Sequence, residues 1–127
     1  VLHGETICEP VPKGTNYAGI KAGIDILAHP GLITEEEVRM AAERGVYLEI
    51  SARKGHCLGN GRVLHLARQC NAKCVINTDA HSPGDLFTPG YREKVAYGAG
   101  MTKEEFALVK KNMQSIINQC RIKTHNV

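Results

Sequence analysis

The sequence predicts an α/β fold in which parallel strands alternate with helices. Short apolar runs indicate four strands, at residues 1–8, 24–28, 46–50 and 74–78. Segments with helical periodicity separate these runs, and successive strands begin about 22 to 28 residues apart, as in βαβ units. The length of 127 residues suits one domain, which we place at residues 1–127.

Capping signals support the helices between the strands. Two capping boxes have the expected spacing: Thr34 with Glu37, and Thr102 with Glu105. We expect Thr15 or Asn16 to cap the first helix, and Asn60 to cap the helix that follows the third strand. The last helix carries an apolar stripe between residues 106 and 120, which is typical of a face packed on a core.

The composition is that of an ordinary globular domain, with 43% hydrophobic residues, 23% charged residues and a net charge of +3. This charge is too small to predict a nucleic-acid or membrane partner, although it suits a small anionic substrate. Two Phe, four Tyr and no Trp offer little platform for stacking single-stranded bases. No leader or membrane span is recognised, and five cysteines without a dense framework predict reduced thiols in a cytoplasmic protein.

Candidate metal ligands follow the predicted strands. In parallel sheets, ligands bind beyond the carboxyl ends of the strands. His3 lies in the first strand, His29 follows the second strand at a Pro-Gly turn, and Asp79 and His81 follow the fourth. In an extended segment, Asp79 and His81 would point to the same side. We therefore predict that His3, His29, Asp79 and His81 bind metal, with His29, Asp79 and His81 as the catalytic group; a capping Asp with a hydrogen-bonded His is the alternative.

A basic loop after the third strand is a candidate phosphate site. Arg53, Lys54 and His56 lie close together in the sequence, and an Arg fork beside an ammonium group suits phosphate. A solvated loop without ligand is the alternative. Glu5 and Glu9 are candidates for contact with the substrate or a metal, and a buried or capping role is the alternative for both. There is no P-loop or dinucleotide fingerprint in the sequence.

Four segments together resemble the PHP (polymerase and histidinol phosphatase) family, and most closely its histidinol-phosphatase-like members: residues 3–6 (HGET), 25–31 (DILAHPG), 48–51 (LEIS) and 77–81 (NTDAH). The resemblance implies a distorted, TIM-barrel-like β/α barrel that hydrolyses phosphoesters with up to three divalent ions, often zinc, manganese or iron. It also implies that His3 and His29 hold one metal, Asp79 a second and His81 a third.

The family's opening His-x-His motif and its bridging Glu have no counterpart in this chain. We therefore expect the C-terminal portion of a PHP domain, lacking the N-terminal strands and incompletely loaded with metal. Such a partial barrel would leave strand edges and apolar faces uncovered, which predicts a homo-oligomer. The alternative function is a non-catalytic, truncated PHP-like domain that acts as an oligomeric or binding module.

Overall fold

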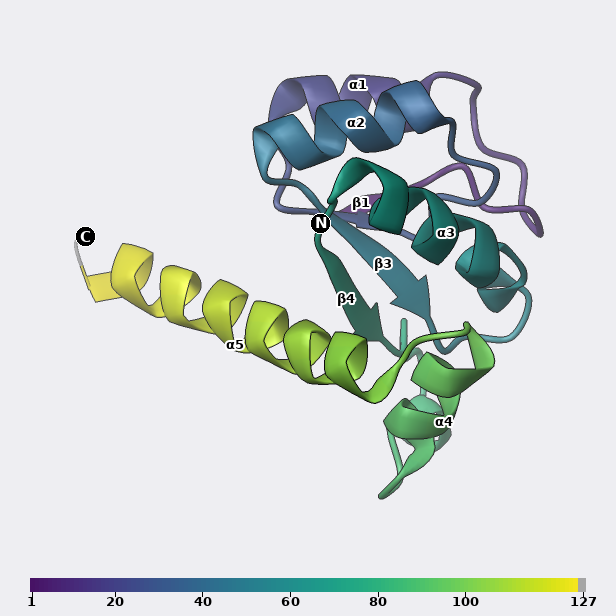
Figure 1. Ribbon diagram of the computed structural model, residues 1–127, viewed down its shortest axis with the longest axis vertical. Helices are drawn as coiled ribbons and strands as arrows, with labels where there is room; N and C mark the ends of the chain where they lie inside the picture. The colour runs from purple at the N-terminus through teal and green to yellow at the C-terminus, as the bar shows by residue number, and fades with distance from the viewer. Residues whose placement is uncertain (126–127) are drawn as a thin grey trace.

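A four-stranded parallel sheet forms the centre of the fold, which confirms the predicted α/β class. The computed structural model describes the backbone of residues 1–125 and the side chains of residues 1–120. The strands are β1 (Leu2–His3), β2 (Ile26–Ala28), β3 (Tyr47–Ser51) and β4 (Cys74–Asn77), and each pairs in parallel with the next (Figure 1). All carboxyl ends therefore lie along the same edge of the sheet.

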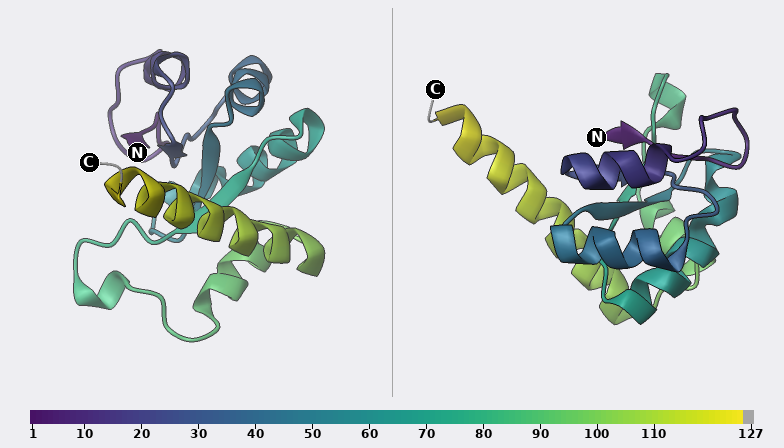
Figure 2. Two further views of the ribbon diagram at one scale, coloured as in Figure 1. Left: turned by 90° about the vertical axis from the view of Figure 1, so that its left-hand side faces the viewer. Right: turned by 90° about the horizontal axis from the view of Figure 1, so that it is seen from above.

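The helices cover the sheet in chain order. They are α1 (Thr15–Ala22), α2 (Glu35–Arg44), α3 (Asn60–Cys70), α4 (Tyr91–Gly98) and α5 (Lys103–His125), with short 3-10 turns η1 (His56–Gly59) and η2 (Pro83–Asp85). Helices α1, α2 and α3 pack side by side, while α5 packs on β4 and extends past the body of the molecule (Figures 1 and 2). Within residues 1–125, no helix combines the length and apolarity that a membrane span requires.

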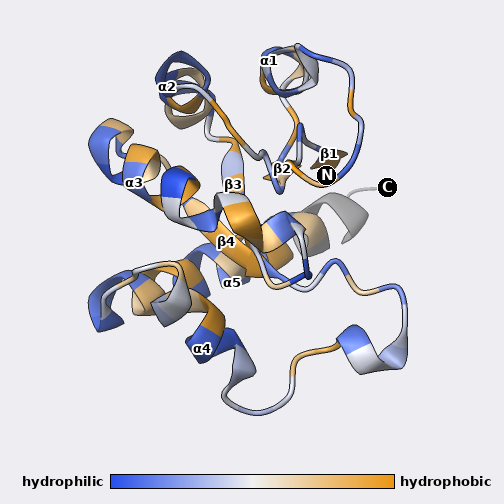
Figure 3. Cartoon of the chain, turned by 90° about the vertical axis from the view of Figure 1, so that its right-hand side faces the viewer, coloured by the Kyte–Doolittle hydropathy of each residue, from blue (hydrophilic) through white to orange (hydrophobic). Residues whose placement is uncertain are grey.

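The core lies between the sheet and these helices. Leu48 and Ile50 of β3 are fully buried, and they share one core with Val38 of α2, Val63 of α3 and Val109 of α5. Figure 3 shows the apolar residues gathered along the strands and on the helix faces that meet them. Because every residue of β3 is buried, this strand is a rigid support for the loop and the 3-10 turn η1 that follow its carboxyl end.

The first strand is shorter than predicted. The ladder pairs only Leu2 and His3, and one further backbone bond joins the Gly4 amide to the Ala28 carbonyl at 2.9 Å. A Cβ on Gly4 would lie 2.5 Å from that carbonyl oxygen, so only glycine permits this approach. The next amide, that of Glu5, leaves the ladder because it donates to a side chain, as described below.

Two asparagines predicted as helix caps instead fix the ends of strands. Asn16 accepts a hydrogen bond from the Glu5 amide and donates to the Pro30 carbonyl, both at 2.9 Å. Asn60 accepts from the Ser51 amide at 2.9 Å and donates to the Ser51 carbonyl at 2.8 Å. The caps themselves are glycines at positions 14 and 59. Both asparagine side chains thus satisfy buried backbone groups where the chain leaves the sheet.

The two predicted capping boxes are confirmed, and the second also anchors α5 to α3. Thr34 and Glu37 form a complete box at the start of α2. At α5, the Thr102 amide donates to Glu105 and the Glu105 amide donates to the Thr102 hydroxyl. Arg68 of α3 also donates to both carboxylate oxygens of Glu105, at 2.6 and 2.7 Å. The Arg68 hydrogen bonds, together with the bond from the Thr102 amide, lower the pKa of Glu105 to about 2.

Replacing Glu105 with Gln is expected to lower the free energy of unfolding by up to about 1 kcal/mol at neutral pH, the usual limit for an exposed ion pair. The pKa of Glu105 lies below its ordinary value of 4.5 in the folded protein, so the carboxylate stabilises the fold above about pH 4.5. This contribution is lost as the pH falls toward 2. Urea unfolding at several pH values should show that the free energies of unfolding of the wild-type protein and Glu105→Gln become equal in acid. The exposed neighbour Glu104 serves as the matched control, and an equal loss in Glu104→Gln would contradict the assignment.

Candidate metal site

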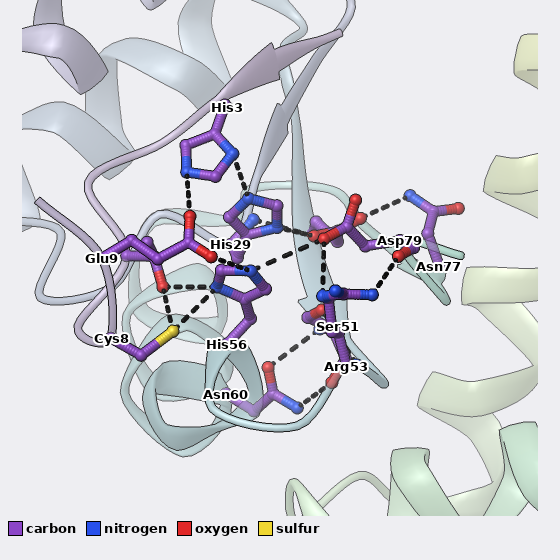
Figure 4. Close-up of polar contacts among 12 residues, drawn as sticks. His3, Cys8, Glu9, His29, Ser51, Arg53, His56, Asn60, Asn77 and Asp79 are labelled. Carbon is purple, nitrogen blue, oxygen red and sulfur yellow. Dashed lines mark hydrogen bonds and ion pairs between the residues drawn. The ribbon is translucent and has the colours of Figure 1, made fainter. Parts of the chain in front are cut away.

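Three imidazole rings gather at the carboxyl edge of the sheet (Figure 4). His3 ends β1, His29 follows β2, and His56 begins η1 after β3. The rings of His29 and His56 stack with their centroids 4.0 Å apart, and the ring of His3 meets that of His29 edge-on at 4.4 Å. The structure therefore brings His3 and His29 together, and adds a histidine that the sequence had placed in a basic loop.

A buried carboxylate orients His29. Oε2 of Glu49 accepts from the His29 backbone amide at 2.8 Å and lies 2.9 Å from His29 Nδ1. Because a carboxylate only accepts, Nδ1 carries the proton and the lone pair lies on Nε2. That Nε2 lies 3.0 Å from His3 Nδ1. The other Glu49 oxygen accepts from the Asn77 side chain at 3.0 Å. A carboxylate behind a histidine is the usual support for a metal-binding imidazole.

Asp79 completes a group of three possible ligands. Its Oδ2 lies 3.5 Å from His56 Nε2 and 3.4 Å from Arg53 Nε, and Arg53 also donates to the Asp79 carbonyl at 2.9 Å. One ligand atom from each of His29, His56 and Asp79 lies within 4.8 Å of the other two. These residues come from three different strand ends, so the fold itself assembles the group.

Backbone strain marks two of these residues. In residues 1–125, three residues other than glycine have a positive φ: His29 at 30°, Asn71 at 54° and Asp79 at 49°. Asn71 is the C-cap of α3, where this conformation is common. His29 and Asp79 instead adopt it directly beyond the strands, at a cost of about 1 kcal/mol or more each. Such strain is typical of residues whose side chains must point in one direction.

Polar side chains contact both ring nitrogens of His56. On one side, Nδ1 lies 2.6 Å from Thr6 Oγ1 and 3.2 Å from Cys8 Sγ. On the other, Nε2 lies 3.5 Å from Asp79 and 3.6 Å from Glu9. Burial and the neighbouring His29 lower the pKa of His56, although Glu9 and Asp79 oppose the shift. The lowered pKa favours the neutral imidazole, which is the form that binds metal ions.

His81 does not join this group among the described residues. Its ring is exposed, with Nδ1 2.8 Å from the Asp79 carbonyl, and its amide donates to Asp85 Oδ2 at 2.9 Å. The prediction that Asp79 and His81 point the same way assumed an extended segment. Asp79 has a left-handed backbone conformation, so the alternation of an extended segment does not apply here.

Glu5 has the capping role that the sequence left open. Its Oε1 accepts from the amides of Gly14 and Asn16, at 2.8 and 3.0 Å, which satisfies the first turn of α1. Its carboxylate is therefore committed to the helix rather than to the histidine cluster. The Glu5 prediction as a substrate contact finds no support in these bonds.

A cavity of about 630 Å³ lies next to Arg53. Its lining includes Arg53, Lys54, Thr78, Asp85 and Tyr91. Arg53 reaches Asp79 with its guanidinium group, so it connects the cavity with the cluster. Two of the three residues predicted to bind phosphate therefore line one cavity, whereas His56 is buried in the cluster.

Sequence reasoning missed two residues near the cluster, Glu49 and Cys8, and left the role of a third, Glu9, open. Glu49 had a visible signal, since it is a single carboxylate within an otherwise apolar strand. Cys8 was interpreted as a plain thiol, and Glu9 was left between a metal contact and a structural role. Both lie in an irregular segment after β1, where no periodicity indicates which way a side chain points.

No family model matches the chain. The chain is similar to the uncharacterized protein MJ1295 of Methanocaldococcus jannaschii, with 46% identity over 106 residues. The match covers 83% of this chain and 49% of the archaeal protein, so the chain spans about half the length of the curated relative it matches.

Replacing Glu49 with Gln is expected to weaken the binding of a divalent metal by about 10- to 100-fold, because the anionic partner of His29 Nδ1 is lost. Competition with a chelating dye would measure this affinity for Zn²⁺ and Mn²⁺. Glu43, an exposed residue of α2, provides a matched Glu→Gln control that should bind normally. Unchanged affinity in a folded Glu49→Gln variant would show that this carboxylate does not support a metal ligand.

Proposed function

We propose that this chain is a portion of a metal-dependent phosphoesterase of the PHP family. The observation that carries the proposal is the group of His29, His56 and Asp79 beside a cavity lined by Arg53 and Lys54. The group offers nitrogen and oxygen ligands to a metal, while the cavity offers two cations to a phosphate. The sequence resemblance to the PHP family suggests that the metal and the phosphate take part in one activity, the hydrolysis of a phosphoester.

The donor set fits a divalent ion of the kind that this family uses. Imidazole and carboxylate ligands suit zinc, manganese and iron. Zn–N bonds of about 2.0–2.1 Å place two ligand nitrogens of a tetrahedral site roughly 3.3 Å apart. The 3.0 Å between His29 Nε2 and His3 Nδ1 is close to that separation. We infer that His29, His56 and Asp79 hold the ion, and that His3 is close enough to His29 to serve as a further ligand.

When bound, a divalent ion would supply a Lewis acid that neutralises phosphoryl charge and lowers the pKa of a water. The chain's own residues position the substrate. Arg53 lies between Asp79 and the cavity, so its guanidinium group can hold a phosphate next to the ligand group. Lys54 adds a second, exposed cation at the cavity wall. Glu49 keeps His29 in the orientation that presents Nε2.

We also infer that the sheet is part of a distorted barrel of the PHP type. Sequential order of parallel strands, with a helix after each of the first three, is the pattern from which such barrels are built. The cluster lies at the carboxyl edge, where barrel enzymes place their active sites. The alternative, a binding module without catalysis, would keep the metal ligands and show no hydrolysis.

The protein is expected to release phosphate from p-nitrophenyl phosphate when Mn²⁺ or Zn²⁺ is added and to stop when EDTA is added. Asp79→Asn should lower kcat by about 100-fold or more, because it removes a ligand of the group. Asp25, exposed at the amino end of β2, provides the matched Asp→Asn control and should leave the rate unchanged. Metal binding without any metal-dependent release of phosphate would favour the non-catalytic alternative.

We further expect a homo-oligomer. Two large apolar side chains of α5 are exposed: Leu108 is 57% exposed and Ile117 is 47% exposed. This long helix extends past the body of the molecule (Figure 2). Burying such apolar side chains against a second copy would be favourable. Light scattering after gel filtration should give a mass above the 13.9 kDa of one chain, and Ile117→Lys should reduce it. A stable monomer at micromolar concentration would contradict this expectation.

A further inference from the structure

A second set of possible metal ligands shares His56 with the first group and lies toward the segment that follows β1. It consists of Cys8, Glu9 and His56, and one ligand atom from each lies within 4.8 Å of the other two. Figure 4 shows Cys8 and Glu9 on the segment after β1, next to the His56 ring. Within the described residues, Cys8 is the only one of the five cysteines that takes part in such a group.

Cys8 and Glu9 each lie within 3.2 to 3.6 Å of a ring nitrogen of His56. Cys8 Sγ lies 3.2 Å from His56 Nδ1, and Glu9 reaches His56 Nε2 at 3.6 Å and His3 Nε2 at 3.3 Å. Thr6 Oγ1 lies 2.6 Å from the same Nδ1 and 3.4 Å from Cys8 Sγ. The Thr6 hydroxyl can therefore hydrogen bond to a thiolate at Cys8 once a metal ion occupies Nδ1.

The backbone around His56 holds the thiol in place. Gly55 has a φ of 86°, and a Cβ at this position would lie only 3.0 Å from Cys8 Sγ. The segment before η1 is thus packed directly on the sulfur. His56 is buried, whereas Cys8 and Glu9 are exposed, so an ion can enter from solvent and meet a fixed imidazole.

We propose that Cys8, Glu9 and His56 form a second metal site, selective for zinc over harder ions. A thiolate, a carboxylate and an imidazole are all regular zinc ligands, and a site with three protein ligands leaves a position for water. The thiolate disfavours Mn²⁺ and Mg²⁺, which prefer oxygen ligands. The second site shares His56 with the group of His29, His56 and Asp79, but Cys8 has no role in the phosphoesterase activity, so the two proposals can be tested separately.

The chemistry of Cys8 separates the two sites. The group of His29, His56 and Asp79 contains only nitrogen and oxygen ligands, whereas the second set contains sulfur. Sulfur ligation produces an intense charge-transfer absorption when Co²⁺ replaces zinc, and nitrogen or oxygen ligation does not. Among the other cysteines, Cys57 is the suitable reference because it is exposed and directly follows His56.

The test is a titration of the metal-free full chain with Co²⁺, followed in the near ultraviolet. The wild-type protein and Cys57→Ser should both develop the thiolate-to-cobalt band, and addition of Zn²⁺ should abolish it. Cys8→Ser should lack the band and bind zinc at least about tenfold more weakly at this site. Elemental analysis should then find one zinc fewer per chain in Cys8→Ser than in Cys57→Ser.

Two further variants keep the test decisive. Glu9→Gln should retain the thiolate-to-cobalt band, because Cys8 is still present. This variant should need a higher Co²⁺ concentration to develop the band, because one ligand is lost. Asp79→Asn should retain the band even where phosphate release is lost, so that failure of the proposed function and failure of this site are distinguishable. Absence of the band in the folded wild-type protein, or its persistence in Cys8→Ser, would overturn the proposal.

Discussion

The arrangement of the histidine cluster depends on one buried carboxylate, that of Glu49. It lies in the middle of β3, where every residue is buried, and such a position is costly for a charge unless hydrogen bonds satisfy it. Both of its oxygens are engaged, by the backbone and ring of His29 and by the Asn77 side chain. Glu49 therefore joins the ends of β2 and β4 through β3, and the position of His29 follows from that connection.

The rest of the site is built outward from this connection. His29 supports the stacked ring of His56, which Thr6 and Cys8 contact on one edge and Asp79 approaches on the other. The asparagine bonds that fix the ends of strands keep these loops close to the sheet. Hydrogen bonds of polar side chains thus hold the loops at the carboxyl edge, and the buried side chains of Glu49, Asn16 and Asn60 all have partners there.

The sequence was sufficient to predict the regular parts of the fold. Alternating apolar runs and helical periodicity predicted the parallel sheet, and the spacing of Thr34 and Glu37 predicted a real capping box. The same topology placed His3, His29 and Asp79 near one edge, because the carboxyl ends of parallel strands coincide. The resemblance to the PHP family stays a prediction, as do the barrel, the substrate and the oligomer.

The irregular segments could not be predicted in the same way. His81 was expected beside Asp79, but this requires an extended backbone, and the left-handed φ of Asp79 has no signal in a single sequence. His56 was placed in a basic loop with Arg53 and Lys54, because nothing in the sequence showed that η1 would turn the ring inward. Cys8 reaches it from 48 residues away in the chain. Such contacts depend on how two loops pack on each other rather than on any local pattern.

The positive φ angles of His29 and Asp79 have a consequence for how this protein can change over time. Glycine or asparagine would adopt those backbone angles at lower cost, so selection for thermal stability alone favours replacing both residues. Each replacement would remove a donor from the cluster. A lineage that needs the cluster must therefore retain two locally unfavourable residues, whereas one that no longer needs it gains stability by losing them. Replacement of His29 and Asp79 in a related protein would therefore indicate that its cluster is no longer used.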